Sequence, residues 1–352
     1  MAKRAKPAVA DDMFDSLVLN AIDFLERSTE ELEEHPKYAM IHFSIAIELL
    51  TKARLLTEHW ALIFEKPQEA HISKFQKGDF KSVGTEQAIS RLEAIVGEVV
   101  DERTKRVFKQ IRTHRNSLVH FFHPSYASAN TEAVETVVSE QCAGWYYMYK
   151  LLKEAWRDPF TKYLGRIEGI DARMRANRTF LNVRFNICRP QIEEERRGGA
   201  VFIECPSCGH EACRWCVLVG PLIKLECLVC RIALKVLKVS CPNCKATIVM
   251  TEGQGQCNRC NTPVAIDRLL DQYVEAGEGN RCFCAQCFDT VYPTVGWIGD
   301  RWVFFCCVDD SDEFFTCDDC GRTFAGDLGP LCRECEYSEE HQGNSGFGHA
   351  MW

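Results

Sequence analysis

The chain has 352 residues, enough for two or three domains, and its 46% apolar content excludes wholesale disorder. From residue 201 onward it carries 12 Lys and Arg against 21 Asp and Glu, out of 42 and 50 in the whole chain, so this acidic part is a poor general phosphate binder. No signal-peptide core or run of about 18 apolar residues is present. We therefore expect a soluble, cytoplasmic protein that does not associate with membranes.

Residues 11–160 show the three- and four-residue apolar spacing of amphipathic helices. A first helix is expected over Asp11–Leu32, and Pro36 suits the first turn of a second helix. Pro67–Gly84 has no clear period, which predicts a loop or a broken helix. Thr85 is expected to cap the short helix that follows. This region is thus predicted to be all-α.

Two longer helices complete the predicted bundle. Asp101 should cap the first, which Pro124 ends, and the second is expected over Thr131–Arg157. The second carries an aromatic group, and such groups form a core or dimer interface more often than a base-stacking platform. Its members are Trp145, Tyr146, Tyr147 and Tyr149.

The stretch 109–124 concentrates polar and titratable side chains in a helix-forming segment. Helical geometry, at about 100° per residue, places Arg112, Asn116 and His120 along one face. An imidazole can deprotonate a ribose 2′-hydroxyl or protonate a leaving 5′-oxygen, and a guanidinium suits the extra charge of a pentavalent phosphate. The alternative is that His120 is a core histidine and the arginines are merely solvated.

The segment 115–120, RNSLVH, resembles the R-N-x-x-x-H signature of HEPN domains, a family of small all-helical proteins that includes many metal-independent ribonucleases. Glu48 and Lys52 resemble the family's early E-x-x-x-K helix, although a surface salt bridge is the simpler interpretation. The resemblance covers roughly residues 10 to 160. It implies that His120 acts as acid or base, Arg115 stabilises the phosphorane and Asn116 orients both, in a site shared by two subunits.

Residues 161–200 form a basic connecting segment. It is either a solvated helix or a strip that contacts RNA and supplies positive potential. Its arginines include Arg166, Arg173, Arg175, Arg178, Arg184 and Arg189.

Nineteen of the 21 cysteines lie from residue 205 onward, and most form C-x-x-C pairs. Such a pair places two thiolates on one side of a tight loop, and two pairs about 12 to 20 residues apart close a tetrahedral zinc site. A disulfide module is the alternative, but no secretion signal accompanies the cysteines. Three structural zinc ribbons are expected, from Cys205, Cys208, Cys227 and Cys230; from Cys241, Cys244, Cys257 and Cys260; and from Cys317, Cys320, Cys332 and Cys335.

A fourth zinc site would draw on the remaining cysteines. Cys284 and Cys287 would need donors from Cys282, Cys306 and Cys307, and the last two form a doublet that departs from the usual second C-x-x-C pair. The remaining pair, at 213 and 216, could compete for the metal within the first ribbon. With four thiolates bound, none of these ions would keep an open position for catalysis.

The sequence therefore predicts a multidomain protein with an all-α bundle followed by small β-rich ribbons. The expected parts are a HEPN-like bundle at 11–160, a basic connecting segment at 161–200, tandem ribbons at 201–275, a further ribbon pair at 276–338 and a flexible tail at 339–352.

The function implied is cleavage of RNA by 2′-hydroxyl attack without a catalytic metal, in a homodimer. A toxin, anti-phage or stress role follows only by analogy with the family. The ribbons, with three to four zinc ions, would recognise RNA or a protein partner. The alternatives are a non-catalytic helical dimer that uses its ribbons as a protein-interaction adaptor, and a nucleic-acid-binding regulator.

Overall fold

The computed structural model describes residues 8–121, 123–127, 131–219, 222–250, 254–265, 282–284, 295–298, 301–304, 314–321, 323–325 and 335. The chain divides into two compact units, Met1–Arg189 and Pro190–Trp352. Among the described residues, no helix has the length and apolar character needed to cross a bilayer.

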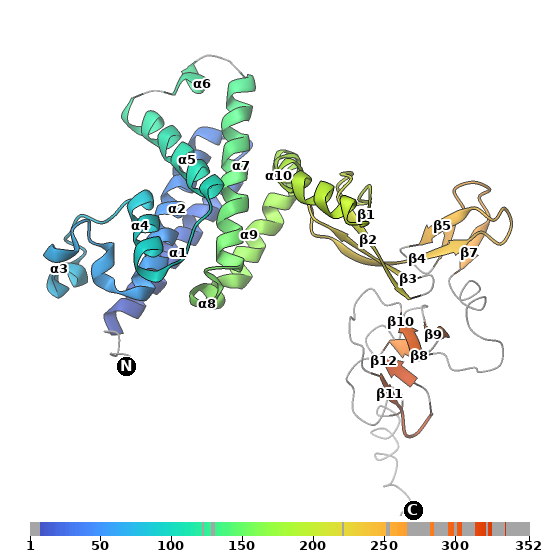
Figure 1. Cartoon of the computed structure of the whole chain (residues 1–352). Coiled ribbons are helices and arrows are strands. Elements are labelled where there is room, and N and C mark those ends of the chain that lie inside the picture. The colour runs from blue at the N-terminus through green and yellow to red at the C-terminus, as the bar shows by residue number, and fades with distance from the viewer. Residues whose placement is uncertain are drawn as a thin grey trace, which may run out of the picture. The chain divides into compact units, whose positions relative to one another are not determined.

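The first unit is helical, as expected (Figure 1). Short 3₁₀ and π turns join its helices at Trp60–Ile63, Pro67–Glu69, Leu92–Val96 and Thr161–Tyr163. Its helices are α1 (Ala8–Glu30), α2 (Pro36–Glu58), α3 (Ile72–Lys77), α4 (Thr85–Arg91), α5 (Glu102–His120), α6 (Pro124–Ala127), α7 (Thr131–Lys153), α8 (Arg157–Phe160), α9 (Leu164–Ala176) and the first part of α10 (Arg178–Arg197).

Helix α2 lies at the centre of this unit and packs against α1, α4, α5 and α7. Pro36 occupies its first turn, where no backbone N–H is needed. Met40, Ala46 and Leu50 are fully buried along it. The predicted amphipathic pattern is therefore confirmed for this helix, and its buried face organises the core.

Helix α5 begins at the predicted cap. The Asp101 carboxylate accepts hydrogen bonds from the backbone N–H groups of Arg103 and Thr104, both at 3.0 Å, and from the Thr104 hydroxyl at 2.6 Å. Thr104, Phe108 and Ile111 form its buried face. Burial on α5 thus stops one turn before the R-N-x-x-x-H segment.

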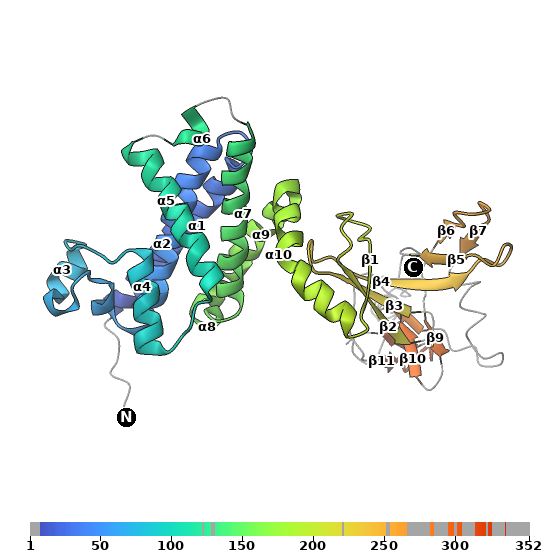
Figure 2. The same ribbon diagram turned by 45° about the horizontal axis from the view of Figure 1, so that its top comes forward.

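Gly144 of α7 sets how closely α5 and α2 approach that helix, and Figure 2 shows α5 and α7 side by side. A Cβ placed at Gly144 would lie 2.3 Å from Ile111 Cδ1 and 2.7 Å from Phe43 Cε1. Glycine inside a helix costs about 1 kcal/mol relative to alanine. Here that cost permits a close three-helix contact, which a larger residue would allow only if the Ile111 and Phe43 side chains shifted.

The segment 60–84 contains Pro67–Gly84, which is predicted from its sequence to be a loop or a broken helix. It consists of short helical turns joined by loops and is anchored to the core. Phe75 is fully buried, and Phe64 and Phe80 stack with ring centroids 4.1 Å apart. The Arg91 guanidinium also donates to the carbonyl oxygens of Phe64 at 2.5 Å and Glu65 at 2.7 Å. These contacts attach the segment to the rest of the bundle.

The second unit contains short strands joined by cysteine loops. Strands β1 to β5 form one antiparallel sheet in chain order, β6 pairs with β7, β9 with β10, and β8 with β12 of the β11–β12 hairpin. The strands are β1 (Val201–Ile203), β2 (Cys213–Val219), β3 (Leu222–Cys227), β4 (Ala233–Ser240), β5 (Thr247–Met250), β6 (Gln254–Gln256), β7 (Pro263–Ala265), β8 (Cys282–Cys284), β9 (Val295–Ile298), β10 (Arg301–Phe304), β11 (Phe314–Thr316) and β12 (Thr323–Ala325).

The last two turns of α10 belong to this second unit. Arg214 of β2 binds the Glu195 carboxylate at 2.7 and 2.9 Å, and Ile192 is buried. Pro190, which lacks a backbone N–H, lies inside α10 at the boundary between the two units. The expected tail at 339–352 lies outside the described residues.

The close approach at Gly144 yields a stability prediction. Gly144→Ala should lower the free energy of unfolding by about 1 kcal/mol, because overpacking by roughly 1–3 kcal/mol exceeds the gain in helix propensity. Gly169→Ala in α9 is the matched control, since a Cβ there meets nothing within 4 Å. That control should raise stability by about 0.5–1 kcal/mol. Thermal unfolding followed by far-ultraviolet circular dichroism would measure the stability changes of both variants. A Gly144→Ala variant more stable than the parent would contradict the packing argument.

Candidate functional site

The R-N-x-x-x-H residues lie on the last turns of α5 at the protein surface. The Arg115 Nη1 atom donates a 2.8 Å hydrogen bond to Asn116 Oδ1, and Arg115 is half-buried while Asn116 is exposed. His120 is the last helical residue and is also exposed, with Val119 51% exposed beside it. The alternative in which His120 is a core histidine is therefore wrong.

Arg112 does not join this group. Its guanidinium lies 3.0 Å from a Glu86 carboxylate oxygen, in an ion pair between α5 and α4. Of the residues expected along one face of α5, Arg112 is thus engaged in an ion pair with α4, whereas Asn116 is bonded to Arg115 at the surface. Arg115, Asn116 and His120 remain the candidate catalytic residues.

A second polar cluster, whose members are too far apart in the sequence to be recognised as a unit, joins α5 to α7. His114 Nδ1 lies 2.6 Å from His123 Nε2, and His114 Nε2 makes a short contact with the Glu140 carboxylate. The Ser125 backbone N–H donates to His123 Nδ1 at 3.2 Å. We call these three side chains the His–His–Glu chain.

The hydrogen bonds assign the tautomers of both imidazoles. Because His123 Nδ1 accepts from Ser125, its proton sits on Nε2 and is donated to His114 Nδ1. His114 then carries its proton on Nε2 and donates to Glu140. Burial, followed by the neighbouring His114, lowers the pKa of His123, although Glu140 acts in the opposite direction. The neutral form of His123 is thus favoured, and a second proton on its ring would break the contact with the Ser125 N–H.

The E-x-x-x-K pair of α2 is a link to the segment 60–84. Lys52 is buried and donates to Glu48 at 2.5 Å and to the Ser82 hydroxyl at 2.8 Å. The pair is therefore more than a surface salt bridge, because Lys52 is buried and also contacts Ser82. The geometry gives the pair an anchoring role.

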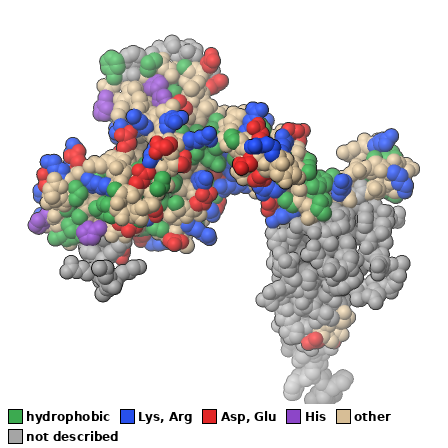
Figure 3. Space-filling view, viewed as in Figure 1, with side chains coloured by type: hydrophobic (Ala, Val, Ile, Leu, Met, Phe, Trp, Pro, Cys, Tyr) green, Lys and Arg blue, Asp and Glu red, His purple; other side chains and the backbone are tan. Residues whose placement is uncertain are grey.

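Three of the six connecting arginines, all on α9, are paired with carboxylates. Arg166 and Arg173 both approach Glu26, at 2.8 and 3.6 Å, and Arg175 binds Asp171 at 2.9 Å. Figure 3 shows basic and acidic side chains intermixed over the helical unit. This pairing favours the interpretation of α9 as a packed helix over that of an RNA-contacting strip.

The aromatic group of α7 belongs mainly to the core. Trp145 and Tyr149 are each 2% exposed and Tyr147 is buried. The Trp145 indole N–H donates to Asp171 at 3.2 Å. These rings pack α7 against α9, so they offer no base-stacking platform.

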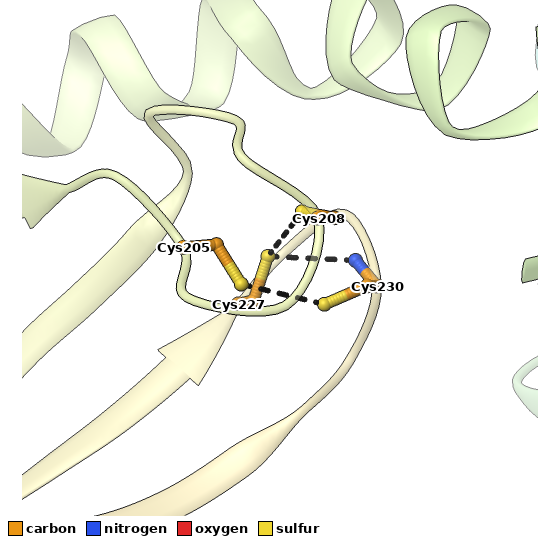
Figure 4. A group of neighbouring side chains, drawn as sticks. All are labelled: Cys205, Cys208, Cys227 and Cys230. Atoms are coloured by element: carbon orange, nitrogen blue, oxygen red, sulfur yellow. Dashed lines mark hydrogen bonds between the residues drawn. The ribbon is translucent and has the colours of Figure 1, made fainter. Parts of the chain in front are cut away.

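Two complete cysteine groups form as the spacing predicted. In the first, which Figure 4 shows, the Sγ atoms of Cys205 and Cys230 are 3.5 Å apart and those of Cys208 and Cys227 are 3.6 Å apart. Tetrahedral zinc with bonds of about 2.3 Å requires sulfur–sulfur edges of about 3.8 Å, whereas a disulfide requires about 2.05 Å. The thiols are therefore positioned to hold a metal ion.

The second group repeats this geometry. Cys241 and Cys260 are separated by 3.6 Å between their Sγ atoms, as are Cys244 and Cys257. The Thr262 hydroxyl lies 3.0 Å from Cys260 Sγ, and this contact lowers the pKa of that thiol to about 6. A thiolate is the metal-binding form, so the site is suited to a cation.

A third group contains Cys317, Cys320 and Cys335. The predicted fourth ligand, Cys332, lies outside the described residues, as do Cys287, Cys306 and Cys307. Cys284 lies in β8, which pairs with β12 beside the third group. The ligand set of a fourth site stays a prediction.

Cys213 and Cys216 are not a metal-binding loop, because they lie on strand β2. Side chains three apart on a strand point to opposite faces, so the two thiols cannot share one ion. Burial raises the pKa of Cys213 to about 12, with a further contribution from neighbouring Cys205. Cys213 is thus a protonated neighbour of the first group.

Comparison with known proteins gives no assignment: no family model, no curated protein and no solved structure matches this chain.

The His–His–Glu chain predicts a pH-dependent stability. Because the folded pKa of His123 is lowered from 6.5, its neutral form contributes stability that is full above pH 6.5 and lost as the pH falls through the folded value. His123→Asn should therefore flatten the pH dependence of helical unfolding between about pH 8 and 5, whereas exposed His35→Gln should retain it. Equal slopes in the His123 variant and the parent would contradict the prediction.

The cysteine groups predict the metal content. Freshly purified protein should carry at least two tightly bound ions per chain, one for each complete four-thiol group. Cys208→Ser should remove about one ion, while Cys216→Ser should remove none. Elemental analysis of the two variants would measure the difference. Equal losses would show that the C-x-x-C pair on β2 takes part in binding.

Proposed function

We propose that the helical unit is a metal-independent endoribonuclease of the HEPN type, and that the ions of the ribbons are structural zinc. The observation that carries the first proposal is the exposed group at the end of α5, where Arg115 and Asn116 are bonded to each other one turn from exposed His120. A substrate phosphate can approach all three side chains from solvent. The resemblance of the segment RNSLVH to the family signature supports the same assignment.

The reaction would be an attack of the ribose 2′-hydroxyl on the adjacent phosphorus. His120 would remove the hydroxyl proton or protonate the leaving 5′-oxygen, since an imidazole can do either near neutral pH. Arg115 would stabilise the charge of the pentavalent phosphorane through its guanidinium fork, and Asn116 would hold that fork in place. The products would be a 2′,3′-cyclic phosphate and a 5′-hydroxyl.

The proposal includes a homodimer in which two α5 ends face each other across a two-fold axis. Val119 and Phe121, which flank His120, are 51% and 83% exposed. Large apolar side chains at that level of exposure suit a protein interface better than open solvent. The same surface also suits the second candidate, a non-catalytic dimer that serves as an adaptor. Cleavage distinguishes the two.

His120→Ala should reduce RNA cleavage by about 10²- to 10⁴-fold while leaving helicity and metal content unchanged, because the proton carrier is lost and the exposed side chain supports no core. Arg115→Lys should restore only part of the activity that Arg115→Ala loses, since an ammonium lacks the bidentate fork.

The control is His35→Ala, another exposed histidine of the same unit. The assay should follow labelled RNA with EDTA added briefly and should identify the product ends. Cutting by His120→Ala at the parental rate, or products without a cyclic phosphate, would refute the assignment. An inactive parental protein that nevertheless dimerises would favour the adaptor.

A further inference from the structure

Strand β4 joins the two complete cysteine groups and is flanked by their loops. It begins three residues after Cys230 and ends next to Cys241. Its eight residues extend for about 25 Å at roughly 3.3 Å per residue. Side chains near its two ends are therefore held at a constant separation. A polymeric ligand that contacts both ends must span that distance with several of its repeating units.

The acidic surplus of the C-terminal part does not extend to this region. From residue 227 to 265 the sequence has five basic residues and one acidic residue, Glu252. From 266 to the end it has five basic and 17 acidic residues. Each tetrathiolate zinc centre would add a formal charge of about −2, but its thiols are mostly buried while the cations are peripheral. Among the described residues of the ribbon that contains β5 and β7, Figure 3 shows Lys and Arg side chains on the visible face.

The backbone gives an independent reason to regard two of these cations as functional. The residue after each described C-x-x-C loop is left-handed, and it is glycine at Gly209 (φ 73°) and Gly321 (φ 67°). In the loops that flank β4 it is Arg231 (φ 62°) and Lys245 (φ 59°). A long side chain with positive φ carries a steric cost that glycine avoids, so a strained cation here indicates a role for its charge.

Two further exposed cations belong to the same pair of ribbons. Lys238 on β4 lies with its Nζ atom 5.5 Å from the ring centroid of Trp215, which is half-exposed on β2. Arg259 lies in the loop 257–260, whose thiols meet those of the loop before Lys245. A cation beside an exposed aromatic ring provides both a phosphate contact and a surface on which an unpaired base can stack.

We propose that this surface, defined by Arg231, Lys238, Lys245, Arg259 and Trp215, binds the backbone of single-stranded RNA. The basic groups contact phosphates along β4, and Trp215 accepts a base that a duplex would keep paired and stacked internally. The binding does not depend on the cleavage proposed above, since a non-cleaving adaptor could hold RNA in the same way. The acidic charge of the whole C-terminal part argues against RNA binding there. The proposal assigns RNA recognition to this ribbon pair alone, where the charge is locally basic.

The test uses the full chain and a uniformly 2′-O-methylated pyrimidine oligonucleotide of about 15 residues, which cannot be cut by 2′-hydroxyl attack. Fluorescence anisotropy at several salt concentrations gives both the affinity and its salt dependence. The variant combines Arg231→Gly, Lys245→Gly, Lys238→Gln and Arg259→Gln. We expect binding to weaken by about tenfold or more, and the slope of log K against log salt to fall by about 0.7 for each lost phosphate contact.

Glycine at 231 and 245 relieves backbone strain, so these two substitutions should raise the thermal stability of the ribbons while they weaken binding. The matched control is Asn261→Gly, which changes the same left-handed position (φ 53°) of the next loop without removing charge. It should bind RNA like the parent. Unchanged affinity in the quadruple variant, an equal loss in the Asn261 control, or preference for duplex RNA would overturn the proposal.

Discussion

The close contact at Gly144 is the constraint on which the rest of the helical unit depends. Ile111 of α5 and Phe43 of α2 occupy the space that a Cβ would take, so three helices meet at one point. This contact fixes α5 by its middle. Ile111 is the last buried residue of α5, and Leu118 packs against the core only while partly buried, so Asn116 and His120 are exposed. Packing in the middle of α5 thus determines the exposure of its end.

The second unit is stabilised differently. Its strands are three to eight residues long, and little apolar surface is available between the cysteine loops. Metal binding to four thiolates would supply the folding free energy that such short strands cannot obtain from burial. The same loops determine which residues adopt positive φ. The C-x-x-C loops therefore place Arg231 and Lys245 on either side of β4.

Features set by short spacing could be predicted from the sequence, and features set by distant contacts could not. The helical periodicity, the Asp101 cap and the thiol pairings follow from neighbours a few to about twenty residues apart. The chain of His114, His123 and Glu140 needs a partner on another helix, which no local pattern reveals. The C-x-x-C pair on β2 has the same spacing as a metal-binding loop, but a strand sends its two thiols to opposite faces.

The three imidazoles of the stretch 109–124 show why the surrounding structure, and not the residue type, determines chemical capability. His114 and His123 use their ring nitrogens on each other, on Glu140 and on a backbone N–H, so neither can exchange a proton with a substrate without breaking that chain. His120 is exposed and has no such bond among the described residues. A general acid or base must reach the reacting oxygen directly or through one water. Of the three, His120 is the one whose exposure would allow such an approach, while the other two attach the chain that follows α5 to α7.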